Sequence, residues 1–133
     1  MIKHPPRSLQ FFALSCALLA AASALPSRAM AAGDAKRGAD VFDSQCAECH
    51  SVRAGKNKKG PSLFASVGRT AGTVPDFVYS DALKQSGITW TPDKIQTYLA
   101  GPKKMVPGGK MKYDSEMTSA DVTDLLVYLG SLH

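Results

Sequence analysis

Five consecutive residues of the chain, Cys46-Ala47-Glu48-Cys49-His50, have the types and spacing to do chemistry. Two thiols three positions apart can each add to one vinyl group of the same porphyrin, and the imidazole that follows can then reach the iron. A C-x-x-C-H sequence is typical of covalent attachment of a c-type haem. We therefore predict that Cys46 and Cys49 bind one haem c and that His50 is an axial ligand of its iron.

Two other interpretations of the C-x-x-C pair fit the sequence less well. A thioredoxin-like redox pair requires a strand and helix around it, and no strand pattern precedes Cys46. A zinc site requires two more Cys or His ligands. The chain offers Cys16, His4 and His133, and the first two lie near the N-terminus.

Residues 1–31 have the organisation of a secretory signal peptide. Lys3 and Arg7 precede a mostly apolar stretch, residues 9–25, and Ala29-Met30-Ala31 fits a small-x-small cleavage site. We predict cleavage after Ala31 and export to the periplasm of a bacterium. The apolar run is shorter than the ~20 residues of a membrane-spanning helix. It is also too uniformly apolar for an Arg-rich mitochondrial transit peptide.

Cleavage leaves residues 32–133 as one domain and changes the charge. The precursor carries 16 Lys and Arg against 11 Asp and Glu, a net charge of +5. Three of the basic residues, and Cys16, lie in the leader, so the mature charge is +2 and only the two haem thiols remain. This small excess does not indicate a nucleic acid partner.

Helical periodicity and capping residues predict an all-α domain. We expect helices over 33–45, over 77–86, from Thr91 to Gly101, and from Thr118 to Leu132. Residues 102–113 contain Gly and Pro without a helical period, so a loop is expected there. Gly38 lies inside the first helix, where it predicts either a poorly formed first turn or close approach of the last helix.

Pro61 follows the haem motif after a loop rich in Lys and Gly. Its carbonyl can accept the Nδ1–H of His50, which would fix the tautomer and make the imidazole a better donor to iron. An ordinary Gly-Pro turn is equally compatible with these residues.

The second axial ligand decides whether the iron is closed or open to substrates. Met105, Met111, Met117, His133 and the lysines are all candidates. Met111 is favoured because it lies between Lys110 and Lys112 in a Gly/Pro-rich loop, where an apolar side chain is exposed unless something buries it. Met105 is the second choice.

From Gly33 to Leu132 the chain resembles a class I c-type cytochrome, close to mitochondrial cytochrome c and bacterial cytochrome c2. The resemblance rests on the haem motif and on further stretches: Gly60-Pro61-Ser62-Leu63, Val67-Gly68-Arg69, Phe77-Val78-Tyr79-Ser80-Asp81-Ala82, Gly87-Ile88-Thr89-Trp90, Tyr98-Leu99-Ala100-Gly101-Pro102-Lys103-Lys104-Met105-Val106-Pro107-Gly108-Gly109-Lys110-Met111 and Asp124-Leu125-Leu126-Val127-Tyr128-Leu129. It implies the cytochrome c fold, with several helices wrapped around one covalently bound haem.

The resemblance also implies roles for residues of the haem pocket. Met111 aligns with the axial thioether and Pro61 with the carbonyl donor to the axial histidine. Arg69, Tyr79 and Trp90 align with residues that contact or neutralise the haem propionates. Tyr98 aligns with a tyrosine whose hydroxyl points toward the methionine sulfur.

Two positions depart from the family's pattern. Leu83 stands where the family usually has Asn, and Gly109 stands where it usually has Thr. Both usual residues belong to a polar network with a buried water beside the methionine ligand. The departures leave open whether this chain has such a network.

These observations predict a monomeric, soluble single-haem electron carrier rather than an enzyme. With His50 and Met111 both on the iron, no substrate reaches it, whereas an electron can pass through an exposed haem edge. The alternatives are a peroxidase-like enzyme or a ligand-binding sensor, each of which needs an open sixth position. Expected partners are acidic redox proteins: a membrane oxidoreductase complex, a terminal oxidase, a reaction centre or a soluble dehydrogenase.

The lysines indicate how such a partner would dock. If the loops border the haem edge, they form a basic ring around it, and acidic residues gather in the first and last helices. The ring consists of Lys56, Lys58, Lys59, Lys84, Lys103, Lys104, Lys110 and Lys112.

Overall fold

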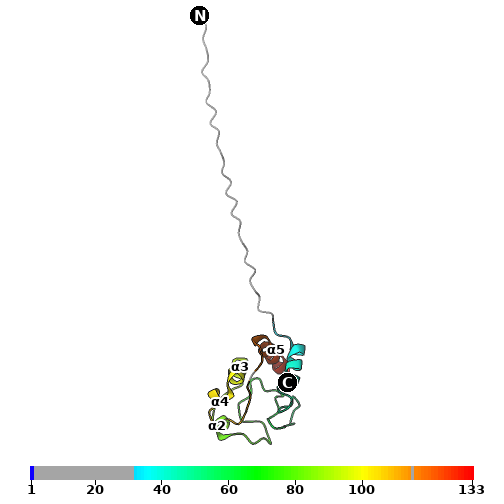
Figure 1. Ribbon diagram of the computed structural model, residues 1–133, viewed down its shortest axis with the longest axis vertical. Helices are drawn as coiled ribbons and strands as arrows, with labels where there is room; N and C mark the ends of the chain where they lie inside the picture. The colour runs from blue at the N-terminus through cyan, green and yellow to red at the C-terminus, as the bar shows by residue number, and fades with distance from the viewer. Residues whose placement is uncertain (2–31, 115) are drawn as a thin grey trace. The chain divides into compact units, whose positions relative to one another are not determined.

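A computed structural model describes Met1, residues 32–114 and residues 116–133 (Figure 1). The helices in this part of the chain are α1 (Ala35–Gln45), α2 (Asp81–Lys84), α3 (Pro92–Ala100), α4 (Pro102–Met105) and α5 (Ser119–Gly130). The only extended pairing among the described residues is an isolated antiparallel bridge between Thr70 and Thr89. The predicted all-α class is confirmed. No helix within the described ranges has both the length and the apolar character needed to cross a bilayer.

Capping bonds confirm three of the four expected helix starts, those of α1, α3 and α5. The side chains of Asp34 and Thr91 accept hydrogen bonds from the backbone N–H groups of Arg37 and Lys94. Thr118 and Asp121 form a reciprocal capping box at the start of α5. These bonds satisfy backbone donors that have no partner inside the helix, which is why the sequence signals are reliable.

Two of the expected elements were wrong in extent. The helix predicted over 77–86 spans only Asp81–Lys84, because the Ser80 hydroxyl accepts from the Leu83 N–H and begins the helix late. The loop predicted over 102–113 begins with the single turn of α4. Pro102 fits the first position of that turn, where its missing N–H has no helical partner.

Helices α1 and α5, although far apart in sequence, pack side by side (Figure 1). Phe42 from α1 meets Leu125 and Leu129 from α5 in the buried core, to which α3 adds Leu99. A Cβ on Gly38 would lie 2.1 Å from the backbone oxygen of Asp124. Close helix approach therefore explains this glycine, as one of the two sequence interpretations expected.

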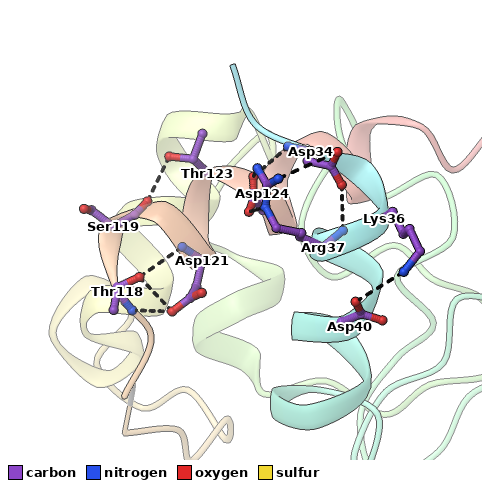
Figure 2. A network of polar contacts seen from close by, with 9 residues as sticks. All are labelled: Asp34, Lys36, Arg37, Asp40, Thr118, Ser119, Asp121, Thr123 and Asp124. Carbon is purple, nitrogen blue, oxygen red and sulfur yellow. Dashed lines mark hydrogen bonds and ion pairs between the residues drawn. The ribbon is translucent and has the colours of Figure 1, made fainter. Parts of the chain in front are cut away.

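A polar junction ties the beginning of α1 to α5 (Figure 2). The Asp124 carboxylate accepts from the Asp34 backbone N–H at 2.6 Å and from Nε of Arg37 at 2.7 Å. These two donors, the Arg37 guanidinium foremost, hold the pKa of Asp124 below its usual value. The junction and the close contact at Gly38 together hold the first half of α1 against α5.

Gly38→Ala is expected to destabilise the protein by about 1–3 kcal/mol or more, because the added methyl group must push α1 and α5 apart. Gly130→Ala is the matched control, since a Cβ at this helical position meets no atom within 4 Å. It should leave stability unchanged or raise it by up to about 1 kcal/mol. Urea denaturation measures both, and equal stability of the two variants would contradict the packing described here.

Candidate functional site

A cavity of about 420 Å³ lies against α3 and α5 and the loops between the helices. Its wall contains Cys46, Cys49, His50 and Met111, which are separated by up to 65 positions in the chain. The other residues predicted for the haem pocket line the same cavity: Pro61, Arg69, Tyr79, Trp90 and Tyr98. Val78 also lines it and is 81% exposed, so the cavity reaches the protein surface there.

The C-x-x-C-H segment forms a turn at the end of α1. Cys46 is the C-cap of the helix, and its N–H donates to the carbonyl of Phe42. The N–H groups of Cys49 and His50 then both donate to the Cys46 carbonyl, at 3.1 and 2.9 Å. This turn brings both free thiols and the imidazole to the same cavity wall.

The environment of Cys46 is unsuited to a reactive redox thiol. Burial, with a smaller contribution from Cys49, raises the pKa of Cys46 to about 11. Thiol–disulfide catalysis instead uses cysteines of lowered pKa. Among the described residues, no three His, Cys, Asp or Glu side chains are grouped to hold a metal ion, so a zinc ligand set is not found there.

His50 is held by the loop that contains Gly60 and Pro61. Its Nδ1 lies 2.8 Å from the Pro61 carbonyl oxygen, the hydrogen bond predicted from sequence. A Cβ on Gly60 would lie 2.3 Å from Cε1 of the imidazole, so only glycine allows this approach. Donation from Nδ1–H leaves Nε2 with the lone pair that a metal requires.

Burial favours the neutral form of this imidazole. Desolvation lowers the pKa of His50, and the positive charge of Lys58 acts in the same direction, while the Pro61 hydrogen bond opposes them. A neutral ring of defined tautomer is the form that ligates iron.

Met111 alone among the methionines of the described ranges lines the cavity. It is partly buried and packs against the core cluster of Phe42, Leu99, Leu125 and Leu129. Met105 belongs to α4 and Met117 precedes α5, and neither borders the cavity. The thioether and the imidazole therefore share one cavity, while the second-choice methionine lies outside it.

Arg69 provides a half-buried positive charge in the cavity wall. Its terminal nitrogens donate to the carbonyl oxygens of Phe64 and Ser62, at 2.8 and 2.9 Å. Burial lowers the pKa of Arg69 and raises that of Tyr79. None of the ion pairs formed by the described residues includes Arg69. A carboxylate inside the cavity would supply the missing counter-charge.

Aromatic and aliphatic side chains form most of the remaining wall. The rings of Trp90 and Tyr98 are 5.0 Å apart, and burial raises the pKa of Tyr98. Leu83, at the position where the resemblance leads one to expect Asn, lines the cavity as well. This part of the wall is therefore apolar.

Ser66 is a cavity residue that the sequence did not reveal. Its side chain is buried, and its hydroxyl has no hydrogen-bond partner among the residues that the structure describes. A serine in an irregular segment normally indicates a solvated loop. The burial of this hydroxyl at the cavity wall is visible only in the folded structure.

Two of the predicted docking lysines have carboxylate partners within the chain, and five of the eight line the cavity or a hollow beside it. Lys59 pairs with Glu48 at 2.6 Å and Lys84 with Asp81 at 2.9 Å, so part of their charge is compensated locally. Lys59, Lys110 and Lys112 line the main cavity, and Lys103, Lys104 and Lys112 line a neighbouring hollow beside Met111. Lysines from three separate segments thus lie close to one cavity.

The residues present fit a covalently bound haem c. Two thiols are available for the vinyl groups, an imidazole nitrogen and a thioether sulfur for the iron, and Arg69 for a propionate. The buried, unpartnered Ser66 hydroxyl indicates that a polar group belongs in the cavity.

Comparisons with known proteins agree with this fit. Residues 35–133 match the family model described as Cytochrome c. Cytochrome c of Gibberella zeae is 46% identical over 101 residues, which cover 75% of this chain and 95% of that protein. Cytochrome c2 of Rhodopila globiformis is 42% identical over 100 residues, 75% of this chain and 94% of the relative.

A solved structure, cytochrome cH from Methylobacterium extorquens, has the same fold with a TM-score of 0.68. It is 40% identical and the match covers 74% of this chain and 99% of the other. This chain therefore belongs to the cytochrome c family, the single-haem electron carriers that hold one haem c covalently.

Proposed function

We propose that this protein is a soluble, monomeric electron carrier whose iron is ligated by His50 and Met111 and exchanges electrons through an exposed haem edge. The observation that carries the proposal is the shared cavity, which brings the imidazole and the thioether together with both thiols. With both axial positions filled, no substrate or gas would reach the iron.

Haem c, when bound, supplies a one-electron Fe(III)/Fe(II) couple, and a thioether ligand raises its potential. The chain's own residues would do three things for it. Pro61 would keep the imidazole in its Nδ1–H tautomer, because its carbonyl oxygen accepts a hydrogen bond from Nδ1–H, with 2.8 Å between nitrogen and oxygen. The Cys46 and Cys49 thioethers would fix the macrocycle, and Arg69 would balance a propionate charge. A site held this rigidly would limit the reorganisation that accompanies electron transfer.

Carbon monoxide distinguishes this carrier from a peroxidase-like enzyme or a ligand-binding sensor. We expect the reduced holoprotein to bind little carbon monoxide at neutral pH, because Met111 would hold the iron position that the gas needs. Prompt binding, seen as a shift of the visible spectrum, would favour one of the two open-site alternatives.

We further propose that residues 1–31 are a signal peptide removed after Ala31 and that the mature protein acts in the bacterial periplasm. This leader lies outside the described residues apart from Met1. Mass spectrometry of the purified protein should find an N-terminus near Ala32. An intact leader on the haem-loaded protein would contradict the export proposal.

Acidic redox proteins are the proposed partners, as membrane complexes, a terminal oxidase, a reaction centre or a soluble dehydrogenase. The basis is the position of Lys110 and Lys112 at the cavity and of Lys103 and Lys104 at the hollow beside Met111. We assign less of the docking energy to Lys59 and Lys84, which have carboxylate partners within this chain.

Lys104→Glu is expected to slow the bimolecular electron-transfer step with an acidic partner several-fold at low salt. Lys94→Glu makes the same charge change on α3, at an exposed residue that lines neither the cavity nor the hollow. Stopped-flow kinetics should show that Lys94→Glu slows the bimolecular step less than Lys104→Glu does. The rate should also fall as salt rises, since the Debye length shrinks from ~30 Å at 0.01 M to ~10 Å at 0.1 M. Equal effects at the two lysines, or no salt dependence, would exclude the docking role.

A further inference from the structure

Ser66 lines the cavity, and the proposed function gives its hydroxyl no role. It is 4% exposed. Its Oγ is the one buried side-chain oxygen or nitrogen without a hydrogen-bond partner among the described residues. A buried hydroxyl is costly unless it is paired, so such groups in native proteins almost always have a partner. The partner of Ser66 has to come from the cavity that it lines.

The other buried serines show what the usual arrangement is. The Ser51 hydroxyl donates to the Lys56 carbonyl, and the Ser62 hydroxyl donates to the Arg53 carbonyl at 2.6 Å. The Ser80 hydroxyl accepts the N–H of Leu83 at the start of α2. Each is satisfied within the chain. Ser66 differs from all three.

The backbone places Ser66 at the same end of the cavity as Arg69 and Trp90. The Arg69 N–H donates to the Ser66 carbonyl at 3.1 Å, and the Trp90 N–H donates to the Arg69 carbonyl at 2.9 Å. Arg69 and Tyr79 also influence each other's pKa. This end of the cavity therefore combines a positive charge with several hydrogen-bond donors, the environment that a carboxylate requires.

We propose that the Ser66 hydroxyl donates a hydrogen bond to the haem propionate that Arg69 neutralises, and that Ser66 is a positioning residue that tunes the reduction potential. The inference deepens the proposed function and rests on it. At Leu83 and Gly109 the chain lacks the polar side chains usual in the resemblance described above, and Leu83 makes its part of the wall apolar. Ser66 supplies a neutral donor from another segment of the wall.

The electrostatic consequence has a definite sign. A donor on the propionate withdraws negative charge from the field at the iron and so favours Fe(II). Removing the donor favours Fe(III) and lowers the potential. Loss of a hydrogen bond to the charged carboxylate also raises its pKa. The pH range over which the potential depends on pH should therefore move upward.

Ser66→Ala in the purified holoprotein tests the proposal. We expect the equilibrium constant for reduction to fall about threefold, a shift of about 28 mV given 59 mV per tenfold for one electron. Ser66→Thr, which retains a hydroxyl, should keep most of the parent potential. Ser86→Ala is the control: its hydroxyl donates to the Leu83 carbonyl at 2.8 Å and does not line the cavity. That variant should lose stability and keep the potential.

Redox difference infrared spectra with ¹³C-labelled propionates identify the partner directly. The propionate carboxylate band should shift in Ser66→Ala and not in Ser86→Ala. If the band is unchanged in Ser66→Ala, Ser66 binds only a water molecule. If the reduction potential is unchanged in that variant, Ser66 has no influence on it. Either result overturns the inference. Failure of the proposed function is recognised separately, because the parent protein would then lack a covalent haem or a reversible one-electron couple.

Discussion

Met111→Ala is expected to open the sixth coordination position and to lower the reduction potential by more than about 59 mV, a tenfold change for one electron. The physical reason is the loss of a soft thioether that favours Fe(II). Met111 is partly buried between the cavity and the core cluster, so truncation would leave a gap in the cavity wall. The reduced variant should bind carbon monoxide promptly.

Met105→Ala is the matched control for this experiment. Met105 is equally a methionine of the Gly/Pro-rich region, but it lies in α4 and does not line the cavity. Its truncation should cost some stability and leave the spectrum, the potential and carbon monoxide binding near those of the parent. If the Met105 variant is the one that loses thioether ligation, the assignment of Met111 is wrong.

Replacing the cysteines is expected to have the second large effect. Cys46→Ser or Cys49→Ser should remove one thioether each, and His50→Ala should prevent formation of a normal holoprotein. The turn at the end of α1 presents all three side chains to one cavity wall, so a hydroxyl in place of a thiol leaves a vinyl group unreacted. Pyridine haemochrome spectra count the remaining vinyl groups, and mass spectrometry detects the covalent haem.

Glu48→Gln keeps C-x-x-C-H intact and provides the control. Glu48 is exposed and pairs with Lys59, so its replacement removes one surface ion pair. Such a pair contributes little to stability. This variant should carry a haem with two thioethers. A holoprotein without covalent haem, in the parent or in this control, would contradict the attachment proposal.

Sequence patterns predicted the parts of this protein that depend on local chemistry. The caps of α1, α3 and α5 were predictable because the capping side chains lie within three residues of the groups they satisfy. The contact between His50 and Pro61, which are eleven positions apart, was implied by the resemblance, whereas the residues alone were equally compatible with an ordinary Gly-Pro turn. Gly38 was informative because glycine inside a helix costs about 1 kcal/mol relative to alanine, and close approach of the last helix was one of the two explanations that the sequence offered.

The features that sequence missed include two short helices and the lining of the cavity. Ser80 had been included within a longer helix, but its hydroxyl begins α2, and the preceding residues Phe77 and Tyr79 line the cavity instead. Pro102 was interpreted as loop although it starts the turn of α4. Ser66 appears as an ordinary loop serine until the fold encloses it. The environments of Ser66, Phe77 and Tyr79 are decided by distant parts of the chain that close the cavity. The starts of α2 and α4 are local, and sequence patterns missed them because each helix is only a single turn.

A potentiometric titration of the purified mature protein, followed by visible spectroscopy, tests the central claim most directly. The account predicts a single reversible one-electron transition between two six-coordinate spectra, at a potential raised by the thioether ligand. A protein that shows no reversible one-electron step, or whose reduced form is five-coordinate, would contradict ligation by His50 and Met111 and with it the role of electron carrier.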